Sequence, residues 1–179
     1  MKLFPKFGWR ITKYNPAFRN ENGAYLNDEW ISISDVGKIF DGEILTLPEY
    51  RKAEDAYVST ALRFFSESGI ESLEISYVEK KNLDKLGRQL IGDISYDPKF
   101  IRKGIPISSE VLESVCRLVL REVVWCVLES EANFYIHFGY DYYMYIGSNS
   151  QSVKAIKYAR ESGLFVEPMM SPYLNVGEE

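Results

Sequence analysis

Residues 134–147 read FYIHFGYDYYMYIG, a stretch with seven aromatic side chains and a single charged one, Asp141. Apolar residues lie on both sides of Gly139, Tyr140 and Asp141, a pattern typical of two strands joined by a short turn. The stretch therefore predicts an antiparallel β-hairpin. A hairpin of this composition needs helices to cover one of its faces.

The two faces of this hairpin differ in their side chains. Three of them would pack against helices: Phe134, Ile136 and Phe138. Three tyrosines would remain on the other face: Tyr135, Tyr143 and Tyr145. Tyrosine combines a large contact area with a polar tip, and binding surfaces are enriched in it. The second face is therefore a candidate binding surface; the alternative is that these tyrosines are ordinary half-buried sheet residues.

The clearest helix of the sequence lies at 47–68. Thr46, followed three residues later by Glu49, matches a capping box. Apolar residues then recur at three- and four-residue steps as far as Phe65, and Gly69 follows as the stop. The start, the apolar face and the stop agree, so we expect one long amphipathic helix here.

Two further helices are expected after this one. The first begins at Ser108 and extends over 108–129, although residues 123–128 alone could equally form a buried strand. The second covers 151–162 and ends at Gly163, which suits the residue after a helix.

Alternating segments indicate strands at 9–14, 73–78 and 164–166, and a short helix is expected at 82–90. With the hairpin, these elements predict a single α+β domain over residues 1–179. Its mostly antiparallel sheet of about five strands would be packed with three helices in two layers.

Charge and hydropathy exclude several classes of partner. The chain carries 21 Lys and Arg against 26 Asp and Glu, a formal net charge of −5. Phosphate backbones require a basic surface, so no nucleic acid is expected. No apolar run has the length of a membrane span, and the first residues do not form a signal peptide. We therefore expect a cytoplasmic protein that does not enter membranes.

Residues that could carry chemistry are few. Cys116 and Cys126 do not have a metal-binding spacing and are expected to be buried, reduced thiols. His137 is the only histidine, and no nucleophile motif accompanies it. We expect no metal site, no cofactor and no catalytic residue. The alternative is a small enzyme or ligand-binding protein with a pocket near His137 and Asp141.

Nine carboxylates lie between Glu21 and Asp55. Their spacing does not match a calcium-binding loop, which leaves a solvated acidic surface as the simplest interpretation. Such a surface would steer a basic protein partner towards the chain. Four acidic residues are the candidates for this role: Asp28, Glu29, Asp35 and Asp41.

A resemblance to known proteins is carried by WRITKY (9–14), YLNDEWISISDVG (25–37) and LTLPEY (45–50). These segments, in the first third to half of the chain, resemble a group of uncharacterised bacterial proteins of the immunity type, which are encoded beside polymorphic toxins. The resemblance implies a bacterial cytosolic protein of about this size and assigns no functional residue.

Together these observations predict a non-enzymatic protein-binding protein, specifically an immunity protein that neutralises a basic toxin by covering its active site. The acidic residues and the tyrosines would form the binding surface. The sequence leaves homo-oligomerisation open.

Overall fold

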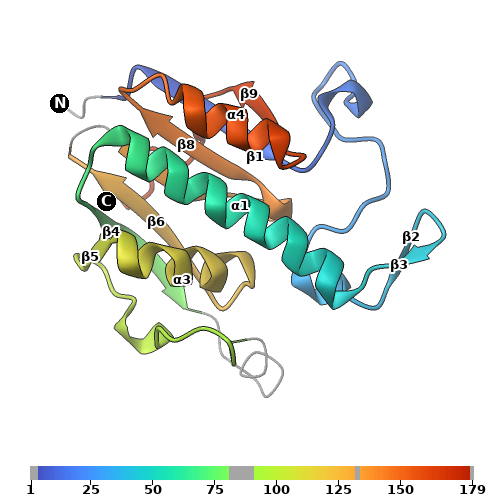
Figure 1. Ribbon diagram of the computed structural model, residues 1–179, viewed down its shortest axis with the longest axis horizontal. Coiled ribbons are helices and arrows are strands. Elements are labelled where there is room, and N and C mark those ends of the chain that lie inside the picture. The colour runs from blue at the N-terminus through green and yellow to red at the C-terminus, as the bar shows by residue number, and fades with distance from the viewer. Residues whose placement is uncertain (1–3, 81–90, 132–133, 178–179) are drawn as a thin grey trace.

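The computed structural model describes residues 4–80, 91–131 and 134–177 and places one large sheet against a layer of helices (Figure 1). The strands of this sheet are β1 (Phe7–Thr12), β4 (Ser72–Lys80), β5 (Pro106–Ser108), β6 (Val124–Ser130), β7 (Phe134–Phe138), β8 (Met144–Ser148) and β9 (Phe165–Pro168). Their order is β5-β4-β6-β7-β8-β1-β9, and every neighbouring pair is antiparallel. The predicted α+β class and hairpin are confirmed, but the described sheet has seven strands rather than about five.

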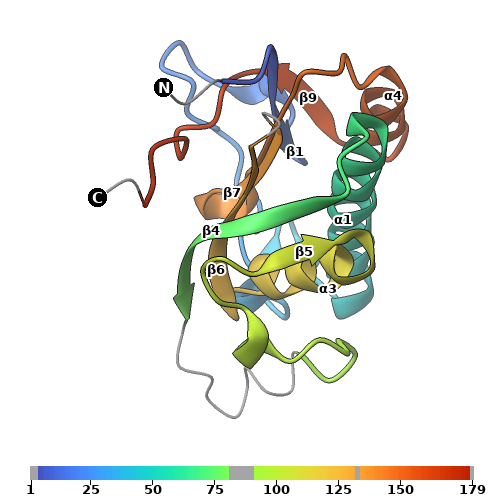
Figure 2. The ribbon, with the colours of Figure 1, turned by 90° about the vertical axis from the view of Figure 1, so that its left-hand side faces the viewer.

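Three helices in the described part of the chain cover one face of the sheet: α1 (Leu47–Ser68), α3 (Ser109–Leu120) and α4 (Val153–Glu161) (Figure 2). α1 lies between the other two and packs against both. A separate small hairpin of β2 (Ile39–Phe40) and β3 (Glu43–Ile44) precedes α1. The helix expected at 82–90 lies outside the described residues. No described helix is long and apolar enough to cross a membrane.

Helix α1 has the predicted boundaries because both of its ends are stabilised locally. The Thr46 backbone N–H donates to the Glu49 carboxylate (2.9 Å), and the Glu49 backbone N–H donates to the Thr46 hydroxyl (3.3 Å). These two bonds complete the capping box. At the other end, Gly69 takes the left-handed conformation with a φ of 73°.

The second predicted helix, 108–129, is wrong in its last part, which is strand β6. Glu122 turns the chain with a φ of 59°. The backbone N–H groups of Glu122 and Val123 donate to carbonyls in the last turn of α3, both at 3.0 Å. The alternative prediction of a buried strand at 123–128 is the correct one. The helix end was missed because a glutamate occupies the position where glycine usually marks it.

A buried ion pair holds this junction against α1. Arg121 is 4% exposed and Glu54 is 0% exposed. Arg121 donates from Nε and Nη2 to the two carboxylate oxygens of Glu54, at 2.7 and 2.9 Å. Its Nη1 and Nη2 also donate to Asp93, and the bond from Arg121 lowers the pKa of Asp93 to about 2. One planar guanidinium thus joins α1, α3 and the segment around Asp93.

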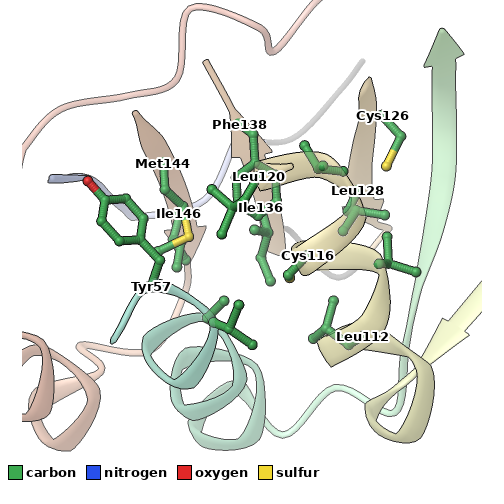
Figure 3. Packing of buried hydrophobic residues seen from close by; sticks show 14 of the residues in the cluster. Tyr57, Leu112, Cys116, Leu120, Cys126, Leu128, Ile136, Phe138, Met144 and Ile146 are labelled. Atoms are coloured by element: carbon green, nitrogen blue, oxygen red, sulfur yellow. The ribbon is translucent and has the colours of Figure 1, made fainter. Parts of the chain in front are cut away.

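The core between the helices and the sheet is apolar (Figure 3). Leu112 and Cys116 lie four residues apart on α3 and face strand residues such as Leu128 and Ile136. Burial raises the pKa of the Cys126 thiol to about 12, so this thiol stays protonated at neutral pH. Both cysteines are free and buried, as predicted.

Helix α4 begins after the start of the predicted 151–162 because its first turn is capped from another element. The backbone N–H groups of Lys154 and Ala155 donate to the carboxylate of Glu67 in α1, at 3.2 and 2.9 Å. A capping partner so distant along the chain leaves no local signal in the sequence.

Replacing Glu54 with Gln should lower the free energy of unfolding by about 3 kcal/mol, because Arg121 would lose its buried counter-charge. Asp55→Asn is the matched control: the Asp55 side chain is 61% exposed and pairs with Arg117 at 2.7 Å. Its loss should cost no more than about 1 kcal/mol. Urea unfolding followed by circular dichroism measures both. If the two variants lost the same free energy of unfolding, the buried Glu54–Arg121 pair would not be an important source of stability.

Candidate functional site

Three of the four predicted acidic residues line one hollow in the surface. This acidic hollow, of about 530 Å³, is lined by Leu26, Asn27, Asp28, Glu29 and Asp41. Asp28 and Glu29 come from the loop that follows β1, whereas Asp41 lies in the turn between β2 and β3. The fold therefore concentrates carboxylates that are well separated in the sequence.

Glu29 is partly neutralised by an ion pair with Lys13. Lys13 Nζ lies 3.4 Å from a Glu29 carboxylate oxygen, and 4.2 and 4.0 Å from the ring centroids of Tyr14 and Trp30. Burial lowers the pKa of Lys13 to about 8, although Glu29 favours the charged form. Asp28 and Asp41 make no ion pair with the described residues, so the net charge of the hollow remains negative.

Asp35 does not join this hollow. It is 7% exposed and accepts hydrogen bonds from the Ile31 backbone N–H (2.9 Å) and the Lys38 ammonium (2.7 Å). Burial alone would raise the pKa of Asp35, but these bonds hold it below its usual value. The expectation of four acids on one exposed surface is therefore wrong for Asp35, which stabilises a loop instead.

Beside the hollow, an apolar pair lies exposed on the β2–β3 hairpin. Ile39 and Ile44 are direct cross-strand partners, and their exposed fractions are 65% and 58%. Asp41 and Gly42 form the turn with φ values of 49° and 83°, as a two-residue hairpin requires. The hairpin projects from the body beyond the start of α1 (Figure 1). Sequence reasoning missed this feature, although Asp-Gly between apolar residues is a recognised hairpin signal.

The loop between β1 and β2 also contributes to a second, smaller cavity. This aromatic cavity has a volume of about 110 Å³ and is formed by the α3–β6 turn, the β7–β8 turn, Ile31 and Glu79. Three carboxylates line it: Glu79, Glu122 and Asp141. Its aromatic walls include Trp125, Phe138 and Tyr142. Because Ile31 is two residues from Glu29, the loop between β1 and β2 contributes to both the cavity and the hollow.

The β7–β8 turn is drawn into the core by an aromatic side chain. Asp141 and Tyr142 both have positive φ, 59° and 66°. The Tyr142 ring packs against Trp30, Tyr50 and Tyr57, with centroids 5.0, 5.9 and 4.8 Å away. A bulky residue in this backbone region is strained, and the packing of its ring offsets that strain.

His137 is separate from the cavity that contains Asp141. It is fully buried, with Nδ1 2.7 Å from the hydroxyl of Ser171 and Nε2 3.4 Å from a carboxylate oxygen of Glu129. Serine, histidine and carboxylate also form nucleophilic triads. Here Ser171 is 5% exposed, and none of the three lines the hollow or the aromatic cavity. The aromatic cavity is thus lined by Asp141 but not by His137.

The tyrosine face of the hairpin is covered rather than open. Residues 169–177 cross the sheet on the side opposite the helices (Figure 2). The Ser171 backbone N–H donates to the Tyr135 hydroxyl (3.0 Å), and the Tyr173 ring packs against Tyr145 (6.0 Å between centroids). Tyr135 and Tyr145 are 3% and 6% exposed. Their predicted exposure is wrong, because this C-terminal segment buries them.

Tyr143 remains half-buried at the edge of the same face. Its hydroxyl accepts a hydrogen bond from Arg19 (3.0 Å), and the guanidinium groups of Arg10 and Arg19 lie 5.5 and 5.4 Å from its ring centroid. Both arginines also approach Glu167, at 2.9 and 3.9 Å. Tyr143 is thus held by local cation–π contacts.

Substituting Ala for Gly147 should destabilise the protein by about 2 kcal/mol, because the new Cβ would overpack the sheet face. That Cβ would lie 2.1 Å from a ring carbon of Tyr135. Gly139→Ala is the milder control, since the nearest atom would be 3.1 Å away. Adding Tyr135→Ala should cancel part of the Gly147→Ala penalty in a double-mutant cycle, because the new Cβ would still lie 2.7 Å from Pro5 Cγ. Additive losses in urea unfolding would show that Tyr135 does not cover Gly147.

Neither a search for metal-ion ligands nor comparison with known proteins assigns a function to these sites. Among residues 4–80, 91–131 and 134–177, no group of three His, Cys, Asp or Glu side chains could hold a metal ion. Compared with protein-family models, curated proteins and solved structures, the chain matches none of them.

Proposed function

We propose that this chain is a non-enzymatic binding protein for a basic protein partner. The observation that carries the proposal is the convergence of Asp28, Glu29 and Asp41 in one hollow beside the exposed Ile39 and Ile44. Buried tyrosines have no part in this surface, which replaces the one expected from the sequence.

The two components of the surface would act at different stages of binding. Carboxylates without intramolecular partners attract a basic protein over several ångströms and raise the association rate. Exposed isoleucines on a projecting hairpin can be desolvated in an interface, where apolar contacts slow dissociation. A basic partner with an apolar recess therefore fits this end of the molecule best.

The resemblance to immunity-type proteins supports a more specific partner. Residues 25–37, one of the segments that carry the resemblance, include Asp28 and Glu29 of the hollow. We therefore propose a basic toxin as the partner, bound in the bacterial cytoplasm so that its active site is covered. The net charge of −5 agrees with such a partner.

The test uses the chain as bait in a lysate of the organism that encodes it, followed by purification of any basic protein captured. Surface plasmon resonance then compares Asp28→Asn/Asp41→Asn with the charge-matched control Glu71→Gln/Glu161→Gln. The first pair should lower the association rate about tenfold at low salt, and less at 0.15 M, where the Debye length is about 8 Å.

A separate double substitution tests the exposed isoleucines of the surface. Ile39→Ser/Ile44→Ser should mainly raise the dissociation rate, by about tenfold or more. Capture of no basic protein would refute the proposal, and so would equal effects of the acidic pair and its control.

A further inference from the structure

The aromatic cavity combines an apolar interior with negative charge. Its inner surface includes Val119, Leu120 and Val124 of the α3–β6 junction together with Trp125 and Phe138. The Trp125 indole N–H donates to the Phe138 carbonyl (2.7 Å), so this donor is satisfied within the wall. The interior therefore offers aromatic and aliphatic contacts and no free indole donor.

The charges of the cavity are all of one sign. No Lys, Arg or His is among its lining residues, which are all described, whereas Glu79, Glu122 and Asp141 are. Glu122 accepts a hydrogen bond from the Ser32 hydroxyl (3.1 Å), and Glu79 accepts one from the Tyr77 hydroxyl (2.7 Å). The Asp141 carboxylate makes no hydrogen bond or ion pair with the described residues. A cavity that combines an unpaired carboxylate with aromatic walls favours an organic cation.

The volume of the aromatic cavity limits the size of the cation that it can hold. The volume of about 110 Å³ is several times what one water needs and well below the ~300 Å³ typical of pockets for drug-sized ligands. A cationic side chain with an aliphatic stem fits that range. Its stem would lie against the apolar walls while its charged end meets the carboxylates, as long basic side chains do elsewhere.

We infer that the aromatic cavity binds an arginine or lysine side chain of the basic partner. This inference rests on the proposed function and deepens it, because it assigns the partner a specific anchor residue. One partner could contact both the cavity and the hollow. Ile31 lines the cavity and Glu29, two residues earlier in the same loop, lines the hollow. Central anchors of this kind, often arginine, contribute most of the affinity of an interface.

A test that needs no partner uses capped amino acids as probes. N-acetyl-arginine methylamide and N-acetyl-lysine methylamide would be titrated while the Trp125 indole resonance is followed by ¹H–¹⁵N NMR, with Trp125→Phe for its assignment. The corresponding citrulline derivative is the control, since it has nearly the shape of arginine and no charge. The charged probes should shift the Trp125 signal saturably, and citrulline should bind about tenfold more weakly.

Three variants locate the binding. Asp141→Asn and Glu122→Gln should each weaken the arginine probe several-fold, whereas the charge-matched control Glu71→Gln/Glu161→Gln, which does not alter the lining of the cavity, should leave its affinity unchanged. Glu122→Gly distinguishes a loss of binding from a loss of stability. It supplies glycine at a left-handed position, so the variant should unfold at a higher urea concentration while it loses affinity.

The outcomes distinguish this inference from the proposed function. Equal binding of citrulline and arginine, no saturable shift at Trp125, or unchanged affinity in Asp141→Asn would each overturn the inference. If these results accompany capture of a basic protein that depends on Asp28 and Asp41, the proposed function stands without the anchor. If the probes bind as expected but no basic protein is captured, the cavity remains a cation site and the proposed function falls.

Discussion

The guanidinium of Arg121 lies between the carboxylates of Glu54 and Asp93, and the arrangement of the proposed binding surface depends on this contact. Arg121 directly follows α3, so the contact fixes where β6 begins and where Glu122 and Trp125 lie in the wall of the aromatic cavity. Glu54 belongs to α1, which follows closely on the β2–β3 hairpin. One buried pair therefore sets the position of the cavity relative to the hairpin.

Tyr135 and Tyr145 are buried, so the proposed binding surface lies instead at the acidic end of the molecule, which carries the acidic hollow and the β2–β3 hairpin. The three helices occupy one face, while residues 169–177 bury Tyr135 and Tyr145 on the other (Figure 2). Side chains that resemble a binding surface in the sequence are thus part of the interior. The proposed surface consists instead of the carboxylates of the hollow and the exposed isoleucines of the projecting hairpin, which together suit a basic protein with an apolar recess.

Local signals in the sequence predict the elements whose ends are stabilised locally. The helix at 47–68 and the hairpin at 134–147 follow from their own caps, turns and periodicity. The α3–β6 boundary does not, because Glu122 ends a helix where glycine is usual and the apolar pattern of a buried strand resembles that of a buried helix. The acids of the hollow could be named from the sequence, but their convergence, the burial of Asp35 and the aromatic cavity depend on contacts between distant segments.

The proposed function requires a basic partner to contact the acidic hollow and the β2–β3 hairpin. Hydrogen–deuterium exchange of the chain, alone and in complex with the captured basic protein, tests it most directly. Slower exchange on binding is expected at residues 26–45 and in the turns at 119–124 and 139–142, with no change in α4. Protection confined to α4 or to residues 169–177, with unchanged exchange at 26–45, would contradict it.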